Sequence, residues 1–359
     1  MLNSGASSRK QVVALYAFFF SVLLLSFTAP AFSEDKIAVK TDGVEIKFNA
    51  LTQFWFTTGP LWRERTTTGQ IGIVRSSDDE HTYKIRRAEL RFSGKIEGER
   101  INWVVMLDPG ERPSSPLQEA YVELRYIPKV GFRVGQFKVP TSMETLTPFS
   151  QLDFVERAKI IRIFNDNRDI GAFFFGDYKF WEWQFGEING SGQNTADNGV
   201  AKEVIGRLVV KPTQHTHLGG SLRFFTLPNF DENFRLGAEL KIDSHLFGFR
   251  AEALWERYSH FINALINTPP LNVDRMQWGG YTTLLYKLFE KHQICFRFEW
   301  LDEDTRVRRD AIFLATIGYN FFQTSRVKWQ ANFIGQAEQR GNRANLNTYF
   351  GVANLQVSF

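Results

Sequence analysis

The chain has 359 residues, a formal net charge of +4 and one cysteine; 15% of it is aromatic, yet its mean hydropathy is slightly negative at −0.26. A charge this small gives no reason to expect a nucleic-acid partner. The lone Cys295 excludes an intrachain disulfide framework and a cysteine-cluster metal site. Many aromatic side chains mixed with charges at short range are typical of a membrane barrel whose strands alternate between lipid and a polar interior.

Residues 1–33 have the three parts of a secretory signal peptide in order. Arg9 and Lys10 form the basic start, an apolar core follows, and cleavage after Ala31 or after Ser33 fits the small-residue pattern. The alternative is an uncleaved membrane helix, but the apolar run is shorter than the roughly 20 residues that a span needs. We therefore expect export and cleavage of this segment.

Residues 34–359 show apolar and polar side chains that alternate with a period of two almost throughout, which is the pattern of β-strands. The alternation predicts strands near 44–56, 83–96, 100–108, 117–127, 130–138, 170–177, 179–188, 203–212, 215–226, 233–243, 246–258, 275–289, 291–303, 309–321, 325–337 and 345–359. Sixteen strands in a chain of this length leave no room for a second domain.

The polar faces of these strands carry charges of both signs. In "EAYVELRY" (119–126) the odd positions are Glu, Tyr, Glu and Arg, and the even positions are Ala, Val, Leu and Tyr. A water-filled interior tolerates such a face, and the packed core of a secreted β-sandwich or propeller, the alternative fold, does not. Tight turns such as "EGER" and "GDYK" alternate with longer loops such as "DPGERPSSP". This pattern predicts an all-β, antiparallel outer-membrane barrel with short periplasmic turns, long extracellular loops and both termini in the periplasm.

The chain ends in "NTYFGVANLQVSF", which alternates up to the terminal Phe359. We expect this strand to hydrogen-bond to the first strand, "VEIKFNALTQFWF", because an unpaired edge is costly in lipid. The terminal phenylalanine also matches the assembly signal that is typical of outer-membrane barrels.

The longest connection, "VPTSMETLTPFSQLDFVERAKIIRIFNDNRD" (139–169), follows the fifth predicted strand. About thirty residues without alternation are too many for an idle loop, and "SQLDFVERAKII" favours a turn or two of helix. A sixteen-stranded barrel is wide enough to hold water. We therefore expect this third loop to fold into the lumen, narrow it and set its selectivity.

Four segments here carry a family resemblance: "KIRRAELRFSG", "EAYVELRY", "FRVGQFKVPTSMETLTPFSQLDFVERA" and "NRDIGAFFFG". In this order and spacing they resemble the phosphate-selective porins O and P, over most of residues 80–190 and again in the terminal strand. The resemblance implies a sixteen-stranded, trimeric channel of the Gram-negative outer membrane, in which lumen arginines and constriction lysines hold the anion. The positions that carry over are Arg86, Arg87, Lys138 and Arg157.

One departure from the family pattern bears on selectivity. Phosphate-selective members place a lysine in the third loop a few residues before "ER", whereas this chain reads "TPFSQLDFVER", with no lysine and with an added Asp153. We therefore expect uptake of a small anion or a small polar nutrient, with phosphate as one candidate.

Basic residues on predicted lumen faces and in the third loop are the candidate anion-binding groups. They are Arg87, Arg91, Arg125, Lys138, Arg157, Lys159, Arg162 and Arg168. Guanidinium groups match phosphate oxygens in bidentate pairs, and rings of basic residues lower the barrier for an anion. The alternative is that the strand arginines neutralise glutamates of neighbouring strands and that "ERAKIIR" is an ordinary helix surface.

The sequence thus predicts a channel for passive diffusion of small anions through the bacterial outer membrane, as a homotrimer surrounded by lipid. Two alternatives remain: a general, weakly selective porin, and a barrel that binds a partner through long surface loops such as "LWRERTTTGQIGIVRSSDDE". No G-x-S-x-G occurs and no histidine lies in a nucleophile motif, so we expect no enzyme. No cofactor and no metal site are expected either.

Overall fold

The structure is a computed structural model that describes residues 38–41, 43–67, 70–110, 114–164, 168–197, 202–226, 232–262, 271–340 and 343–359. The predicted signal peptide (1–33) lies outside these residues. The strands are β1 (Ala38–Thr41), β2 (Val44–Thr67), β3 (Gln70–Ile96), β4 (Ile101–Leu107), β5 (Leu117–Ile127), β6 (Val130–Lys138), β7 (Arg168–Asp177), β8 (Trp181–Ile188), β9 (Glu203–Thr213), β10 (Thr216–Thr226), β11 (Glu232–Asp243), β12 (Phe247–Ile262), β13 (Leu271–Phe289), β14 (His292–Asp302), β15 (Ile312–Phe322), β16 (Val327–Arg340) and β17 (Arg343–Ser358).

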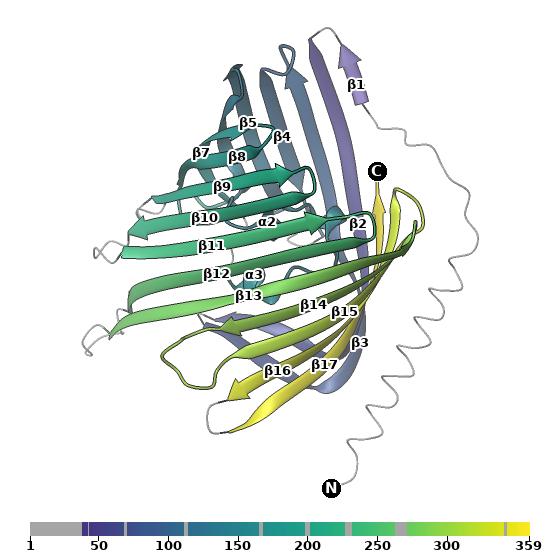
Figure 1. Cartoon of the computed structure of the whole chain (residues 1–359), viewed down its shortest axis with the longest axis vertical. Helices are drawn as coiled ribbons and strands as arrows, with labels where there is room; N and C mark the ends of the chain where they lie inside the picture. The colour runs from purple at the N-terminus through teal and green to yellow at the C-terminus, as the bar shows by residue number, and fades with distance from the viewer. Residues whose placement is uncertain are drawn as a thin grey trace.

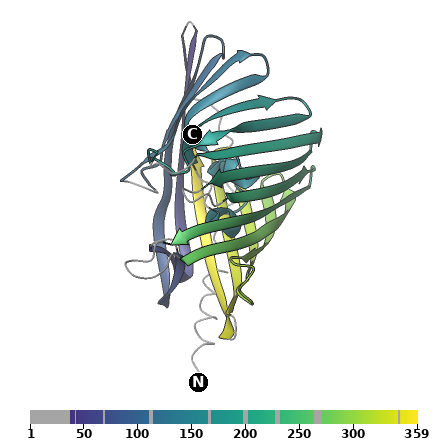
Figure 2. The ribbon, with the colours of Figure 1, turned by 90° about the vertical axis from the view of Figure 1, so that its left-hand side faces the viewer.

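Strands β2 to β17 form a closed antiparallel barrel (Figure 1). Each strand pairs with the next, and β17 pairs back to β2 from Gly351 opposite Thr58 to Ser358 opposite Leu51. The short β1 is an extra strand that pairs only with the start of β2. Figure 2 shows the same wall from the side. The predicted sixteen-stranded barrel is confirmed.

The seam between the last and the first strand is bonded by both backbone and side chains. The Phe359 N–H donates to the Ala50 carbonyl at 2.9 Å, and the Ala50 N–H donates back to the Phe359 carbonyl at 3.3 Å. Inside the lumen, Gln53 Nε2 donates to Gln356 Oε1 at 2.9 Å. The prediction that the terminal strand closes on the first is therefore confirmed, and neither strand leaves an open edge along this seam.

Side chains alternate between an exposed outer face and a buried face that looks into the lumen. On β14, Ile294, Phe296 and Phe298 are exposed, whereas Arg297 and Glu299 are buried. The outer face is apolar, as contact with lipid requires, and the charged side chains lie inside the barrel. No helix among the described residues is long and apolar enough to cross a bilayer.

The first hairpin is longer than the sequence predicts. Predicted strands 44–56 and 83–96 are extended to Val44–Thr67 and Gln70–Ile96, so most of the expected long loop is paired strand. The Gly59-Pro60 pair in the sequence indicates a loop. The structure instead shifts register between Pro60 and Trp62, and a bulge is a place where a strand tolerates proline.

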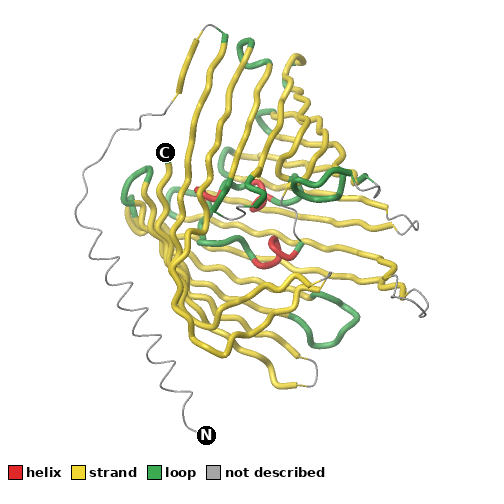
Figure 3. The backbone as a smooth tube through the Cα atoms, turned by 180° about the vertical axis from the view of Figure 1, so that it is seen from behind, coloured by secondary structure: helices red, strands yellow, loops and turns green. Residues whose placement is uncertain are grey.

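The connection between β6 and β7 lies inside the barrel, as predicted, and its described part (139–164) is called the inward loop below. It contains α2 (Met143–Leu146), the short 3-10 helix η1 (Phe149–Gln151) and α3 (Lys159–Ile163). Figure 3 shows these red segments surrounded by the yellow strands. The predicted helical stretch is thus split, with 152–158 outside both helical pieces.

Candidate pore constriction

The inward loop starts with a helix turn that a lumen carboxylate holds. Ser142 caps α2, because its Oγ accepts from Thr145 N–H at 3.1 Å. On β12, Glu252 accepts from the N–H groups of Met143 at 3.0 Å and Glu144 at 2.8 Å. The first N–H groups of a helix have no partner within the helix and favour a negative charge. A carboxylate on the wall therefore fixes the position of α2.

The middle of the loop is bonded to the lumen face of β16. Lys328 Nζ donates to the carbonyls of Ser150 at 2.9 Å and Leu152 at 3.1 Å, and Asn332 Oδ1 accepts from Val155 N–H at 2.8 Å. These wall residues satisfy backbone groups that would otherwise be buried without partners. The polar lumen face here serves to hold the loop.

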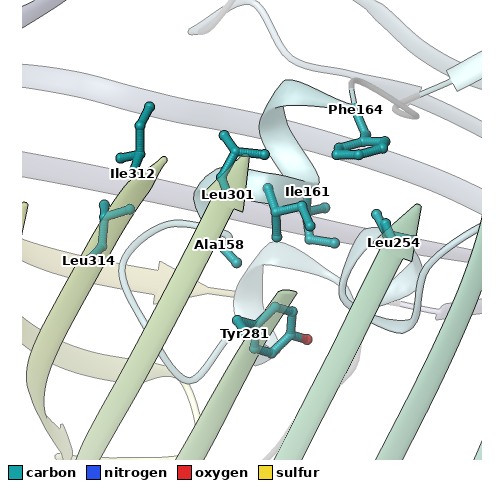
Figure 4. Packing of buried hydrophobic residues seen from close by; sticks show 9 residues of the cluster. Ala158, Ile161, Phe164, Leu254, Tyr281, Leu301, Ile312 and Leu314 are labelled. Carbon is teal, nitrogen blue, oxygen red and sulfur yellow. The ribbon is translucent and has the colours of Figure 1, made fainter. Parts of the chain in front are cut away.

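The end of the loop packs against the wall through apolar side chains (Figure 4). This cluster contains four residues of α3 and its flanks: Ala158, Ile160, Ile161 and Phe164. The wall supplies the other five: Leu254, Tyr281, Leu301, Ile312 and Leu314. The wall residues lie on β12 to β15 at lumen-facing positions. Glu299 also accepts from the Lys159 N–H at the start of α3. The loop is therefore held by a small hydrophobic core as well as by hydrogen bonds.

A pair of adjacent arginines clamps the loop from the opposite side. The register of β2 and β3 shifts between Gln53 and Phe54, which makes Arg86 the extra residue of a bulge. Neighbours on a regular strand point to opposite faces, but a bulge re-aims a side chain. Arg86 Nη2 and Arg87 Nη2 thus both reach the carboxylate of Glu156, at 3.0 and 3.2 Å. The family segments "RRA" and "FVER" meet at this contact.

The two arginines control the charge of the loop carboxylate. Burial alone would raise the pKa of Glu156, but Arg87 and Arg86 hold this pKa well below its usual range. The carboxylate is therefore ionised throughout the neutral range and holds the loop to β3 as a charged group.

Arg157 braces the loop from within. Its Nε donates to the Glu144 carbonyl at 2.9 Å, and its Nη2 donates to the carbonyls of Thr145 at 3.1 Å and Thr147 at 3.0 Å. The guanidinium lies 4.0 Å from the ring centre of Phe149. Burial lowers the pKa of Arg157 to about 10, so the group stays charged at neutral pH.

Two cavities lie on either side of the inward loop. The periplasmic cavity, of about 600 Å³, lies between the loop and β2 to β7 and reaches Phe359. Its basic side chains are Arg91, Arg133, Lys138 and Arg168, and its acidic side chains are Glu89 and Glu119. The extracellular cavity, of about 270 Å³, lies between the loop, β14 to β17 and the β2–β3 pair. Its basic side chains are Lys84, Arg86, Arg157, Lys159, Arg162 and Arg297, and its acidic side chains are Glu156, Glu299 and Glu303.

Four of the predicted residues lie on strands around the periplasmic side. Arg91 and Arg168 both pair with Glu119, at 3.2 and 3.1 Å. Lys138 Nζ donates to the carbonyls of Leu146 and Thr147, at 3.3 and 3.1 Å. Arg125 pairs with Glu123 at 2.9 Å near the end of β5. The structure thus brings three of them to one cavity and leaves Arg125, which is absent from its lining, apart.

The other predicted residues belong to the loop or contact it. Arg87 is buried, with its guanidinium 3.4 Å from the ring centre of Phe149. Lys159 and Arg162 line the extracellular cavity; Arg162 is exposed, and Lys159 Nζ donates to Gln336 Oε1 at 3.1 Å. Burial, with help from the nearby Arg162 charge, lowers the pKa of Lys159 to about 8.

Several strand arginines form ion pairs with glutamates of the lumen wall, which is the alternative to a role in anion binding that the sequence left open. The pairs are Arg207 with Glu239, Arg223 with Glu203, Arg235 with Glu256 and Arg297 with Glu299. Such pairs, between nearby strands or two positions apart on one strand, stabilise the wall and reduce its net electrostatic field in the lumen. No group of three or more metal-ligating side chains occurs within the described ranges.

Sequence reasoning missed three features of the site. Lys84 lies over the Trp55 ring at 4.8 Å, two positions before Arg86 and on the same lumen side. Arg133 pairs with Glu123 at 2.7 Å, which the alternation of "FRVGQFK" could have indicated. The apolar residues of β12 to β15 at lumen-facing positions break the polar pattern there, and this break marks where the loop docks.

A closed sixteen-stranded barrel with an inward third loop between two cavities that charged side chains line is the architecture of an outer-membrane porin. Solved structures with this fold include the outer membrane channel DcaP of Acinetobacter baumannii, with a TM-score of 0.68, 8% identity and coverage of 92% of this chain and 100% of that one. The anion-selective porin from Comamonas acidovorans has a TM-score of 0.67 at 10% identity, with coverage of 88% and 100%. The trimer form of OmpT from Vibrio cholerae has a TM-score of 0.62 at 9% identity, with coverage of 89% and 100%.

The model of the family described as phosphate-selective porin O and P matches residues 69–243, and over this stretch the chain is similar to that family. The matched region contains the clamp of Glu156 and the whole inward loop. A search of curated proteins finds no match. Family and fold are those of channels in the bacterial outer membrane rather than of enzymes.

Proposed function

We propose that the protein is a diffusion channel for small anions. The observation that carries this proposal is the excess of basic side chains in both cavities beside the inward loop. Low-dielectric walls focus the field of such charges on the water between them. An anion then exchanges part of its hydration for guanidinium and ammonium groups, and multiple weak sites allow it to leave again.

We assign different roles to the basic residues. Arg91, Lys138 and Arg168 would attract anions in the periplasmic cavity, and Lys159 and Arg162 in the extracellular one, because these side chains line the two cavities. Arg87 and Arg157 would act by fixing the loop, because Arg87 donates to the loop carboxylate of Glu156 and Arg157 donates to carbonyls of the loop.

Phosphate is one member of the proposed solute class. The loop has no lysine before "ER", but Lys159 follows this segment by two positions and lines the extracellular cavity. It is the group that could replace the missing cation. For assembly we propose a homotrimer, which the trimer form of OmpT supports by analogy of fold.

The test is single-channel conductance of the purified protein in a planar bilayer, with the reversal potential under a chloride gradient and added phosphate. We expect chloride to carry most of the current and Arg162→Gln to reduce this preference. Lys179→Gln is the matched control, because it removes the same charge from an exposed turn between β7 and β8. A large unselective current would indicate a general porin, and no current would favour a barrel that binds a partner through its surface loops.

A further inference from the structure

The extracellular cavity has an apolar wall, which is unusual for the lumen of a porin. Ile334 on β16 lies directly opposite Phe350 on β17, and Val352 follows on the same face of β17. Leu314 on β15 and Ile163 on α3 extend the wall. Phe350 and Val352 are half-buried rather than buried. A lumen face that only contacts water would be expected to carry polar side chains here.

Basic groups line the same cavity. Lys84 Nζ and the Arg86 guanidinium lie 4.8 and 5.1 Å from the ring centre of Trp55. Lys159 and Arg162 approach from α3. The basic side chains outnumber the acidic ones in the lining, so the cavity combines a positive field with apolar and aromatic surface.

The size of the cavity limits its occupant. Its volume of about 270 Å³ is just below the roughly 300–1,000 Å³ that is typical of pockets for drug-sized ligands. A single ring or a short branched chain fits this space. Inorganic phosphate would gain from the positive field but would leave the apolar wall in contact with water, and a neutral apolar solute would gain nothing from the field.

We propose that this cavity is a binding subsite for organic anions that carry one carboxylate on a compact apolar body, such as a single aromatic ring. The carboxylate would lie toward the Lys159 and Arg162 side and the apolar body against Phe350 and Val352. This inference rests on the proposed anion channel and names the class of anion that the channel holds longest.

The test is block of the chloride current by four probes: benzoate, acetate, inorganic phosphate and benzyl alcohol. Acetate has the charge without the apolar body, and benzyl alcohol has the body without the charge. Burial of part of a ring against the apolar wall should make the benzoate block about tenfold tighter than the acetate block. Benzyl alcohol should not block.

Two pairs of variants assign the block to this cavity. Phe350→Gln with Val352→Thr makes the wall polar without a change in charge, so we expect benzoate to lose its advantage while acetate still blocks. Lys159→Gln with Arg162→Gln should weaken both. Circular dichroism and resistance of the barrel to unfolding in detergent verify that each variant is folded.

The outcomes separate the two proposals. A channel without preference for chloride would overturn the proposed function and this inference together. An anion-selective channel in which benzoate blocks no better than acetate would overturn the inference alone. The same holds if the benzoate block persists in the Phe350 and Val352 variant, because the apolar contact would then lie elsewhere.

Discussion

The two sides of the lumen wall differ in what covers them. From β12 to β16 the wall contacts the inward loop through the α3 core and through groups such as Lys328 and Asn332. From β4 to β7 the wall faces the periplasmic cavity, and most of its charges pair with one another, as Arg168 does with Glu119 and Arg133 with Glu123. Lys138 is the exception, because it donates to two loop carbonyls. The first side is the covered wall and the second is the open wall.

This difference shows that one alternating pattern serves two physical purposes. On the covered wall, lumen-facing side chains form the hydrogen bonds that water would otherwise form with the loop backbone. They must also fit the shape of the loop, as side chains do in a protein core. On the open wall they meet water and solute, where only the sum of charges matters over a Debye length of about 8–10 Å. Substitutions on the covered wall and at the arginine clamp on β3 should therefore move the loop, and those of open-wall residues that do not contact the loop should change the field alone.

The largest effect should come from the α3 core. Ile160→Asn places a polar side chain where the residue is almost fully buried and should destabilise docking of the loop by about 3 kcal/mol. A released loop would increase single-channel conductance and expose Arg157, which is buried in the docked loop, to trypsin. Ile160→Val is the control and should leave both readouts near the original values. Unchanged conductance and protection in Ile160→Asn would show that the core does not hold the loop.

The clamp on Glu156 should give the next largest effect. Arg87→Ala removes the more deeply buried of the two arginines that pair with Glu156 and leaves Arg86 as its partner. This should cost about 2 kcal/mol, less than the roughly 3–5 kcal/mol that follows when a buried charge loses its only partner. We expect a noisier, larger current from partial loss of the loop position. Glu156→Gln in the same chain should restore part of the original behaviour, because it removes the charge that has lost one of its two arginine partners. Full additivity of the two changes would contradict the clamp.

The clamp also has a defined pH dependence. The pKa of Glu156 lies below its ordinary value of 4.5, so its stabilisation is present above this value and is lost only as pH falls through the lowered pKa. Loop protection from a protease should therefore not change through this group between neutral pH and about pH 5.

Much of the barrel could be predicted from sequence, because strand positions follow from alternation alone. The predicted strands 117–127 and 130–138 agree with β5 and β6, and the terminal strand closes on the first. The bulge at Arg86 could not be predicted, since it depends on how β2 pairs with β3. Because of this bulge, both arginines of "RRA" reach the loop. Alternation alone would place these two arginines on opposite faces of the strand.

The site could be predicted only as a set of residue types. Placement of the third loop in the lumen followed from its length, but Arg157 was expected to be an anion-binding group and its guanidinium donates to three carbonyls of the same loop. Nothing in "FVER" distinguishes a brace from a ligand, because a guanidinium suits both. The contacts with Glu144 and its neighbours are tertiary and could not be predicted from this segment, and anion binding by Arg157 stays a prediction.

Lys159 should give a moderate, pH-dependent effect. Because burial lowers its pKa to about 8, its charge is present below this pH and is lost as pH rises through it. We expect the preference for chloride to fall about twofold between pH 7 and 9. Lys159→Arg should remove this dependence, and Lys159→Gln should show the low value at every pH. A pH dependence that survives Lys159→Arg would assign it to another group.

The smallest effect should come from Arg125, although sequence analysis placed it with the other candidates. Its side chain is 45% exposed and pairs with Glu123 at 2.9 Å, and exposed pairs contribute only about 0–1 kcal/mol. Glu123 keeps Arg133 at 2.7 Å when Arg125 is removed, so the open wall retains a compensated charge there. We expect Arg125→Gln to leave conductance, reversal potential and thermal stability within experimental error. A clear loss of anion preference would show that the field at the end of β5 reaches the diffusing ion, and the open wall would then extend to the periplasmic rim.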